Sequence, residues 1–168
     1  IIIKCADQLK KKNFFIKFIF SGNFQDYRNK NHYKDLKKLI NSLALDHYFD
    51  FLGEVPRKDL LNLMYHSSLM INPSKFEGWS TAVEEAKILN KKILLSDIAV
   101  HNEQKNEHCV LFSTNDPNDL SDKIMKHPIE EVKNKNLDLL HKNYLLDRAK
   151  FADRYYGIVK KYVSNKKA

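Results

Sequence analysis

The chain has 168 residues, 43% of them hydrophobic and 30% charged, which is the composition of one globular domain and excludes an intrinsically disordered chain. Its longest apolar run, residues 14–20, is interrupted by Lys17 and is too short to cross a bilayer. The net charge of +8 would suit a phosphorylated ligand, an anionic membrane surface or nucleic acid, but the lysines are scattered and no recognised nucleic-acid-binding motif is present, so we expect no nucleic-acid partner.

The first part of the chain alternates predicted helices with predicted strands. It opens inside a helical pattern, with Ile2, Ala6 and Leu9 on one face and no initial Met, so we expect a piece of a longer protein. A buried strand is expected at residues 14–20, with a turn at 21–23 after it. The pattern then predicts a helix with the apolar stripe Leu36, Leu39, Ile40 and Leu43, a strand at 48–52, and a helix at 58–66.

The alternation continues through the second part of the chain. A short strand at 69–72 precedes a loop at 73–80, a helix at 81–89 and a buried strand at 93–96. We expect a loop through residue 107 and then a strand at 109–112. The next helix is expected to begin with Asp116 as N-cap and Pro117 at its first position.

The C-terminal residues, from about 130 to 162, have helical periodicity with a break near Asn143, and a C-terminal helix is expected at 144–168. Its apolar residues recur at helical spacing, and we expect them to pack in a core rather than to stack on nucleic-acid bases. These residues are Phe151, Tyr155, Ile158, Val159 and Tyr162.

This alternation predicts an α/β fold with an open parallel sheet and helices on both of its faces. Sheets of this kind bind ligands at the carboxyl ends of their strands. Gly22, Gly53 and residues 73–78 all follow predicted strands, so we expect them to converge on one edge of the sheet.

Two carboxylates near the middle of the chain, Glu77 and Glu85, are eight positions apart. Glu77 is expected in a loop and Glu85 in the helix that follows, whose first N–H groups carry roughly half a positive elementary charge and can receive phosphate. On either side of a bound diphosphate, carboxylates are suited to accept hydrogen bonds from sugar and ribose hydroxyls. Alternatively, Glu77 only complements the helix dipole, and Glu84 and Glu85 are solvated surface acids.

With these elements in order, the chain resembles the C-terminal, donor-binding domain of retaining family 4 glycosyltransferases, which have the GT-B fold. The likeness runs from the first helix to at least Phe112. A lone Glu-x7-Glu pair is weak evidence, but here it follows a strand ending in Asn-Pro-Ser and precedes a strand ending in Ser-Asp. The segments that carry the resemblance are FIFSGN (18–23), DFLGEVPRKDLLNLMYHSSLMINPS (50–74), FEGWSTAVEEA (76–86) and LLSD (94–97).

The resemblance implies a role for each part of this pattern. Glu77, the expected catalytic residue, would bind hydroxyls of the transferred sugar, and Glu85 would bind the ribose. Val55 would border the base through its backbone, and Gly22 would let the first turn approach the diphosphate. For Gly22 and Gly53 alone, ordinary turn glycines are an equally good interpretation. Sugar and phosphates would lie against the start of the helix, at Gly78, Trp79, Ser80, Thr81 and Ala82.

Two departures from the family pattern affect the expected activity. Many members have Gly-Phe-Gly after the first Glu, whereas this chain has Gly78-Trp79-Ser80, in which Ser80 could act as the helix N-cap. The family's first strand, its Arg and Lys for the pyrophosphate, and its N-terminal acceptor domain would all lie before Ile1. We therefore expect residues 1–168 to be a single Rossmann-like domain without those parts, with poor donor affinity and no turnover on its own.

The function implied by the resemblance is transfer of a hexose from a nucleoside diphosphate sugar to a polysaccharide or glycolipid acceptor, with retention. No metal cofactor is expected, because amides and basic residues would stabilise the leaving diphosphate. The family's catalytic His belongs to the acceptor domain, and none of the seven His here has a matching place, since His66 is expected on a helix face and His101 in a loop. Alternatives are a nucleotide- or phosphosugar-binding module without transferase activity, or a basic scaffold for nucleic acid or a membrane surface.

The cysteines indicate where the protein would work. Cys5 and Cys109 have no metal-binding or redox spacing, so we expect free thiols in a reducing compartment. This favours a cytoplasmic location, including the inner face of the membrane, where a lipid-linked acceptor would be found.

Overall fold

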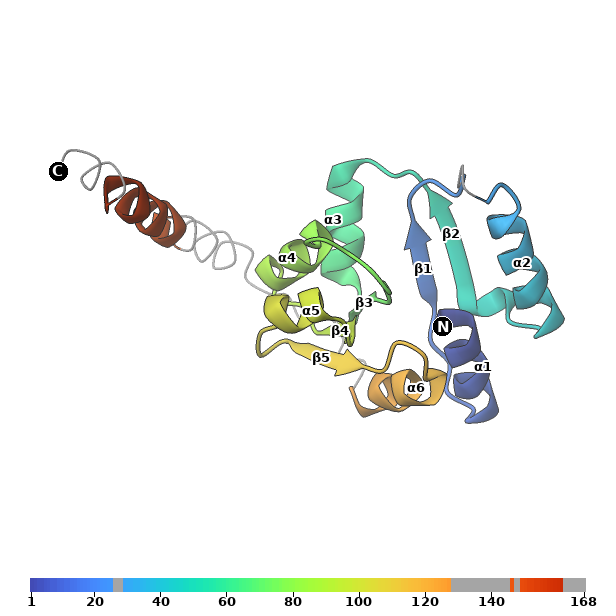
Figure 1. Cartoon of the computed structure of the whole chain (residues 1–168). Coiled ribbons are helices and arrows are strands. Elements are labelled where there is room, and N and C mark those ends of the chain that lie inside the picture. Colours follow the sequence, from blue (N-terminus) through green and yellow to red (C-terminus); the bar gives the residue numbers. More distant parts are fainter. Residues whose placement is uncertain (26–28, 128–145, 147–148, 162–168) are drawn as a thin grey trace. The chain divides into compact units, whose positions relative to one another are not determined.

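The computed structural model describes residues 1–25, 29–127, 146 and 149–161. The chain divides into two compact units, Ile1–Glu131 and Val132–Ala168. The first unit carries alternating strands and helices (Figure 1). In chain order they are α1 (Ile2–Lys11), β1 (Phe18–Ser21), α2 (His32–Ser42), β2 (Phe49–Gly53), α3 (Arg57–His66), β3 (Met70–Asn72), α4 (Thr81–Ile88), β4 (Ile93–Ser96), α5 (Ala99–Gln104), β5 (Cys109–Phe112) and α6 (Pro117–Lys126).

All strand pairs in this unit are parallel. β1 pairs with β2, with Phe18 opposite Phe49, and β4 lies between β3 and β5. The parallel α/β class predicted from the sequence is confirmed, but among the described residues the strands form two hydrogen-bonded sets instead of one sheet.

The central strand β4 is buried on both faces, which explains its continuous apolar sequence. Leu94 packs into a large core cluster that also contains Phe18 of β1 and residues of α1 and α6. Ile93 and Leu95 point to the other side, where they pack against α4. The large cluster thus contacts both sets of strands and joins them through side chains.

Several predicted boundaries were wrong. β1 begins at Phe18, four residues later than predicted, and Tyr48 ends a short 3-10 helix (Asp46–Tyr48) before β2. In α2 only Ile40 of the predicted stripe is fully buried within the helix. The expected loop after β4 contains α5, a helix of six residues. Its buried side chains are His101 and Gln104, so hydrophobic periodicity gave no sign of a helix.

The start of α6 and the two thiols match their predictions. The Asp116 side chain accepts a hydrogen bond from the backbone N–H of Asn118, and Pro117 is the first residue of the helix. Cys5 and Cys109 are free thiols.

The second unit is described only in part. Residues 149–161 are helical, and the break predicted near Asn143 and the remaining part of the predicted helix at 144–168 lie outside the described residues. The side chains of Phe151, Tyr155 and Ile158 are exposed, contrary to the core packing predicted for them. A single helix cannot bury its own apolar stripe, and this unit has no second described element to cover it. Across the described parts of the chain, no helix has the length and apolarity that a bilayer crossing requires.

Candidate functional site

The loop between β3 and α4 carries the first predicted carboxylate, and Asn72 at the end of β3 organises this loop. Asn72 is buried, and its side-chain oxygen accepts from the backbone N–H of Ser74 at 3.1 Å. Its Nδ2 donates to Glu77 Oε2 at 2.9 Å and to Ser80 Oγ at 3.1 Å. One amide therefore fixes the loop at three points.

Glu77 lies in this loop with its side chain 26% exposed, so one part of it faces solvent while the other contacts protein. Burial alone would raise the pKa of Glu77, but side-chain hydrogen bonds from Asn72, Ser80, His101 and Ser74 outweigh burial and lower the pKa below its usual value. The carboxylate is thus held in its ionised form, a hydrogen-bond acceptor at the carboxyl end of a parallel strand.

His101 was missed as a site residue, because it was expected in a loop. The structure places it in α5, fully buried, with Nε2 3.3 Å from Glu77 Oε2 and Nδ1 2.8 Å from the backbone oxygen of Ser96. The Ser96 hydroxyl also lies 3.1 Å from Nδ1, and it donates to the backbone oxygen of Ser74. The sequence held one indirect signal, a polar residue five positions after a buried strand.

A second set of polar side chains lies beside this network. Buried Gln104 donates to the backbone oxygen of Ser80 at 2.7 Å and to Glu84 at 2.8 Å, and Lys87 bridges Glu84 and the backbone oxygen of Gln104. Among the side-chain atoms that the structure describes, Gln104 Oε1 is buried with no hydrogen-bond partner. These contacts tie α5 to the start of α4.

The N-terminus of α4 begins at Thr81, close to the position predicted from the sequence. Ser80 occupies the N-cap position, but its hydroxyl makes no cap hydrogen bond and instead accepts from Asn72, which corrects the predicted capping role. The first N–H groups of a helix have no intrahelical acceptor, so those of Thr81 and Ala82 can bind a ligand. Open space surrounds Gly78, and the Trp79 side chain is 56% exposed.

Glu85 lies on α4, about one turn after its start, and forms an ion pair with Arg57, which begins α3. The two side chains approach to 2.7 Å, with Arg57 70% exposed and Glu85 16% exposed. Val55 is half-buried and comes two residues before Arg57, so the predicted base-binding segment leads into a helix that contacts α4.

Gly22 and Gly53 meet at the carboxyl ends of β1 and β2, but residues 73–78, predicted to converge with them, follow β3 in the other set of strands. The Gly22 N–H donates to the backbone oxygen of Gly53 at 2.7 Å. Both glycines have positive φ, +122° and +72°, which other residues adopt only with strain. No hydrogen bond or ion pair within the described ranges connects these glycines to Glu77.

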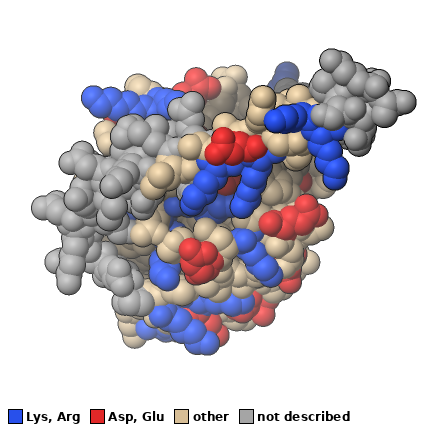
Figure 2. Space-filling model, turned by 90° about the vertical axis from the view of Figure 1, so that its left-hand side faces the viewer, with Lys and Arg blue, Asp and Glu red and all other residues tan. Residues whose placement is uncertain are grey.

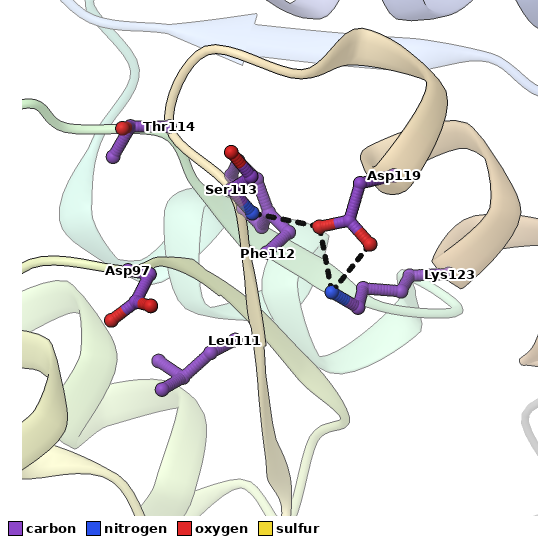
Figure 3. Close-up of a pocket in the computed structure, with 7 residues that line it drawn as sticks. All are labelled: Asp97, Leu111, Phe112, Ser113, Thr114, Asp119 and Lys123. Atoms are coloured by element: carbon purple, nitrogen blue, oxygen red, sulfur yellow. Dashed lines mark hydrogen bonds and ion pairs between the residues drawn. The ribbon is translucent and has the colours of Figure 1, made fainter.

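A hollow of about 320 Å³ lies at the carboxyl ends of β4 and β5 (Figure 3). Its one lysine, Lys123, is paired with Asp119 at 2.7 Å, and Asp119 also accepts from the Ser113 N–H. Burial opposes ionisation of Asp119, but these hydrogen bonds and the nearby positive charges of Lys123 and Lys126 lower its pKa. With its cation already paired, this hollow is a poor anion site.

Charge is spread rather than concentrated on the face seen in Figure 2, where Lys and Arg side chains are interleaved with Asp and Glu. Within the described part of the chain, no three His, Cys, Asp or Glu residues are grouped closely enough to hold a metal ion. The expectation that no metal takes part remains a prediction.

The chain is similar to known glycosyl transferases. The family model for glycosyl transferases group 1 matches residues 1–143. No curated protein matched the sequence.

Three solved structures share the fold. A glycosyltransferase from Rickettsia africae ESF-5 is 22% identical with a TM-score of 0.62, and HepE from Anabaena, solved in complex with UDP, is 20% identical with a TM-score of 0.65. Each match covers 74% of this chain and 33% of the other. Sucrose-phosphate synthase from Thermosynechococcus elongatus is 15% identical with a TM-score of 0.64, over 90% of this chain and 42% of the other. The chain thus spans less than half the length of these proteins.

Proposed function

The chain belongs to the glycosyl transferases group 1 family, and we propose that it forms the donor-binding part of a retaining enzyme that transfers a hexose from a nucleoside diphosphate sugar to a saccharide or lipid-linked acceptor. In this reaction the bond between sugar C1 and the diphosphate oxygen breaks, and the acceptor hydroxyl oxygen bonds to C1 on the same face. The hydroxyl proton leaves with the released diphosphate.

One observation carries the proposal: a carboxylate held ionised lies directly before a helix N-terminus. Glu77 would accept hydrogen bonds from the hydroxyls of the hexose, while the N–H groups of Thr81 and Ala82 would contact the diphosphate. The neighbouring Gly78, Trp79 and Ser80 would border the same ligand. The 26% exposure of Glu77 supports this role, since a fully buried carboxylate could not reach a ligand.

Glu85 would bind the ribose of the nucleotide, with Val55 next to the base. In this structure the Arg57 guanidinium is paired with the Glu85 carboxylate. Because Arg57 is 70% exposed, it is free to move aside when a ribose binds to Glu85. UDP is bound in the Anabaena protein of the same fold, which makes a nucleotide a reasonable occupant here. Gly22 would let the turn after β1 approach the diphosphate.

The remaining parts of the proposed enzyme would come from outside residues 1–168. We propose that an Arg and a Lys for the diphosphate and a wall for the acceptor are supplied by a preceding strand, its loop and an N-terminal domain. No metal is proposed, because leaving-group charge can be stabilised by amides and cations alone. The enzyme would act in the cytoplasm, at the inner face of the membrane when its acceptor is lipid-linked.

The test is a Glu77→Gln variant of the full-length protein. Glutamine keeps the size of the side chain but replaces an ionised acceptor with a neutral amide, so we expect sugar transfer to fall by about a hundredfold or more. Glu84→Gln, a nearby carboxylate that would not touch the ligand, is the matched control and should keep its activity. Transfer is measured with UDP-, GDP- and ADP-linked glucose, mannose and N-acetylglucosamine.

Binding of the same donors is measured by calorimetry. Donor binding without any transfer by the wild type would favour the alternative of a nucleotide- or phosphosugar-binding module. Normal turnover by Glu77→Gln would exclude the role given to this residue.

A further inference from the structure

The groups around the buried His101 ring show that its Nδ1 nitrogen carries a hydrogen. Nδ1 is 2.8 Å from the backbone oxygen of Ser96, which can only accept, and 3.1 Å from the Ser96 hydroxyl oxygen. That hydroxyl already donates its hydrogen to the backbone oxygen of Ser74, so it presents lone pairs to the ring. Both neighbours of Nδ1 are therefore acceptors, and Nδ1 carries a hydrogen.

The other ring nitrogen faces the carboxylate. Nε2 is 3.3 Å from Glu77 Oε2, and two lone pairs facing each other at this distance inside the protein would repel. A proton must therefore lie in the contact, on the ring or on the carboxyl. The same Oε2 also accepts from Asn72 at 2.9 Å, a hydrogen bond that favours the ionised carboxylate. The proton accordingly belongs to the ring.

We propose that His101 is a positioning residue that pairs with Glu77 as an imidazolium, fixing the orientation of the carboxylate and cancelling its charge beside the diphosphate of the donor. The inference rests on the proposed function, in which Glu77 binds the sugar. It resolves an electrostatic problem of that function, since an unpaired carboxylate would repel a diphosphate in the same site. Glu85 has its own cation in Arg57, but the Arg57 guanidinium is 70% exposed, so solvent weakens that pair.

The other charged groups around α5 have partners of their own. Glu84 pairs with Lys87 on α4 and also accepts from Gln104, while Asp97 at the end of β4 accepts from Asn102. Glu77 is thus the carboxylate that contacts the His101 ring.

The first experiment determines the protonation of the ring, using nitrogen NMR of the full chain at pH 7. We expect both ring nitrogens of His101 to be protonated in the wild type. In Glu77→Gln, Nε2 should lose its proton, because the buried imidazolium no longer has a negative charge beside it, whereas Glu84→Gln should change neither nitrogen. An unprotonated Nε2 in the wild type, or no change in Glu77→Gln, would overturn the proposal.

The second experiment measures sugar transfer by the full-length protein in two variants of His101. His101→Phe fills the space without a hydrogen bond, and we expect kcat to fall about 10- to 100-fold, as for a misplaced catalytic group. His101→Gln can still donate to Glu77 but carries no charge, so it should recover most of kcat while KM for the donor stays raised. Equal loss in both variants, in proportion to their loss of thermal stability, would indicate a merely structural residue.

The two proposals fail in different ways. If the wild type transfers no sugar from any of these nucleotide-linked donors, the proposed function is wrong, whatever the NMR spectra show. If the wild type is active and Glu77→Gln transfers sugar normally, only the role given to Glu77 is wrong. If Glu77→Gln is inactive but Nε2 is unprotonated in the wild type, the proposed function stands and the imidazolium pairing is wrong.

Discussion

Cys5 and Cys109 are both free thiols, but the fold gives them different access to water. Cys5 lies in the core on α1, and burial raises the pKa of its thiol to about 12. Cys109 is half-buried at the start of β5, and its Sγ donates to Asn106 Oδ1. Since the thiolate is the nucleophile, only Cys109 should be reactive in the folded protein.

This difference is tested by alkylation with iodoacetamide at pH 8. We expect Cys109 to be modified in the native protein and Cys5 only after unfolding in urea, as read by mass spectrometry of peptides. The raised pKa of Cys5 also makes the stability of the fold depend on pH, because the thiol ionises more easily in the unfolded chain. The contribution of Cys5 to the free energy of unfolding is fully present below pH 9 and is lost as the pH rises from 9 toward 12. Modification of Cys5 as fast as that of Cys109 in the native protein would contradict the prediction.

Among the residues, the positions of Glu77 in a loop and of Glu85 on a helix could be predicted from the sequence, but the partner of Glu77 could not. Glu77 and Glu85 lie within one continuous segment with a recognisable pattern around it. His101 is 24 positions from Glu77, and it reaches the carboxylate only because β4 and α5 fold back beside the loop. The one local signal, a polar residue five positions after a buried strand, does not reveal which group His101 contacts.

Among the elements, α6 begins with a side-chain N-cap, Asp116. The Asp116 carboxylate accepts from the Asn118 N–H at 2.8 Å and satisfies one of the free donors at the helix start. We expect Asp116→Ala to lower the free energy of unfolding by about 0.5–2 kcal/mol, and Asp116→Ser to lower it less. Urea denaturation followed by circular dichroism gives these values, and equal losses in both variants would show that the cap does not matter.

α4 and α6 were predicted near their observed starts because a polar residue or Pro marks each N-terminus. α5 was not, since a six-residue helix is too short for periodicity and buries polar side chains. The strand β1 was predicted too long because Phe14 and Ile16, which precede it, pack against the core without belonging to the sheet. Composition reveals burial, whereas strand pairing depends on distant partners.

Across the described part of the first unit, side-chain packing joins the two sets of strands, which are not paired by backbone hydrogen bonds. The two sets of strands share one apolar cluster, to which Leu94 contributes from β4 and Phe18 from β1. Removing the Leu94 side chain should therefore weaken both sets together, although no strand pair joins them in the described part of the chain.

We expect Leu94→Ala to lower the free energy of unfolding by about 2–5 kcal/mol, and amide exchange should speed up in β1 as well as in β4. Ile88→Ala, at an exposed position on α4, is the control and should change stability by less than about 0.5 kcal/mol. Faster exchange in β4 alone would show that the two sets of strands unfold independently.

The division into two sets of strands also bears on how the chain folds. β1 and β2 come entirely before β3, β4 and β5 in sequence, and each set pairs only within itself among the described residues. Each set can thus be completed from one continuous stretch of chain, and closing a short loop costs less entropy than closing a long one. During synthesis, β1 could pair with β2 before the loop that holds Glu77 has been made.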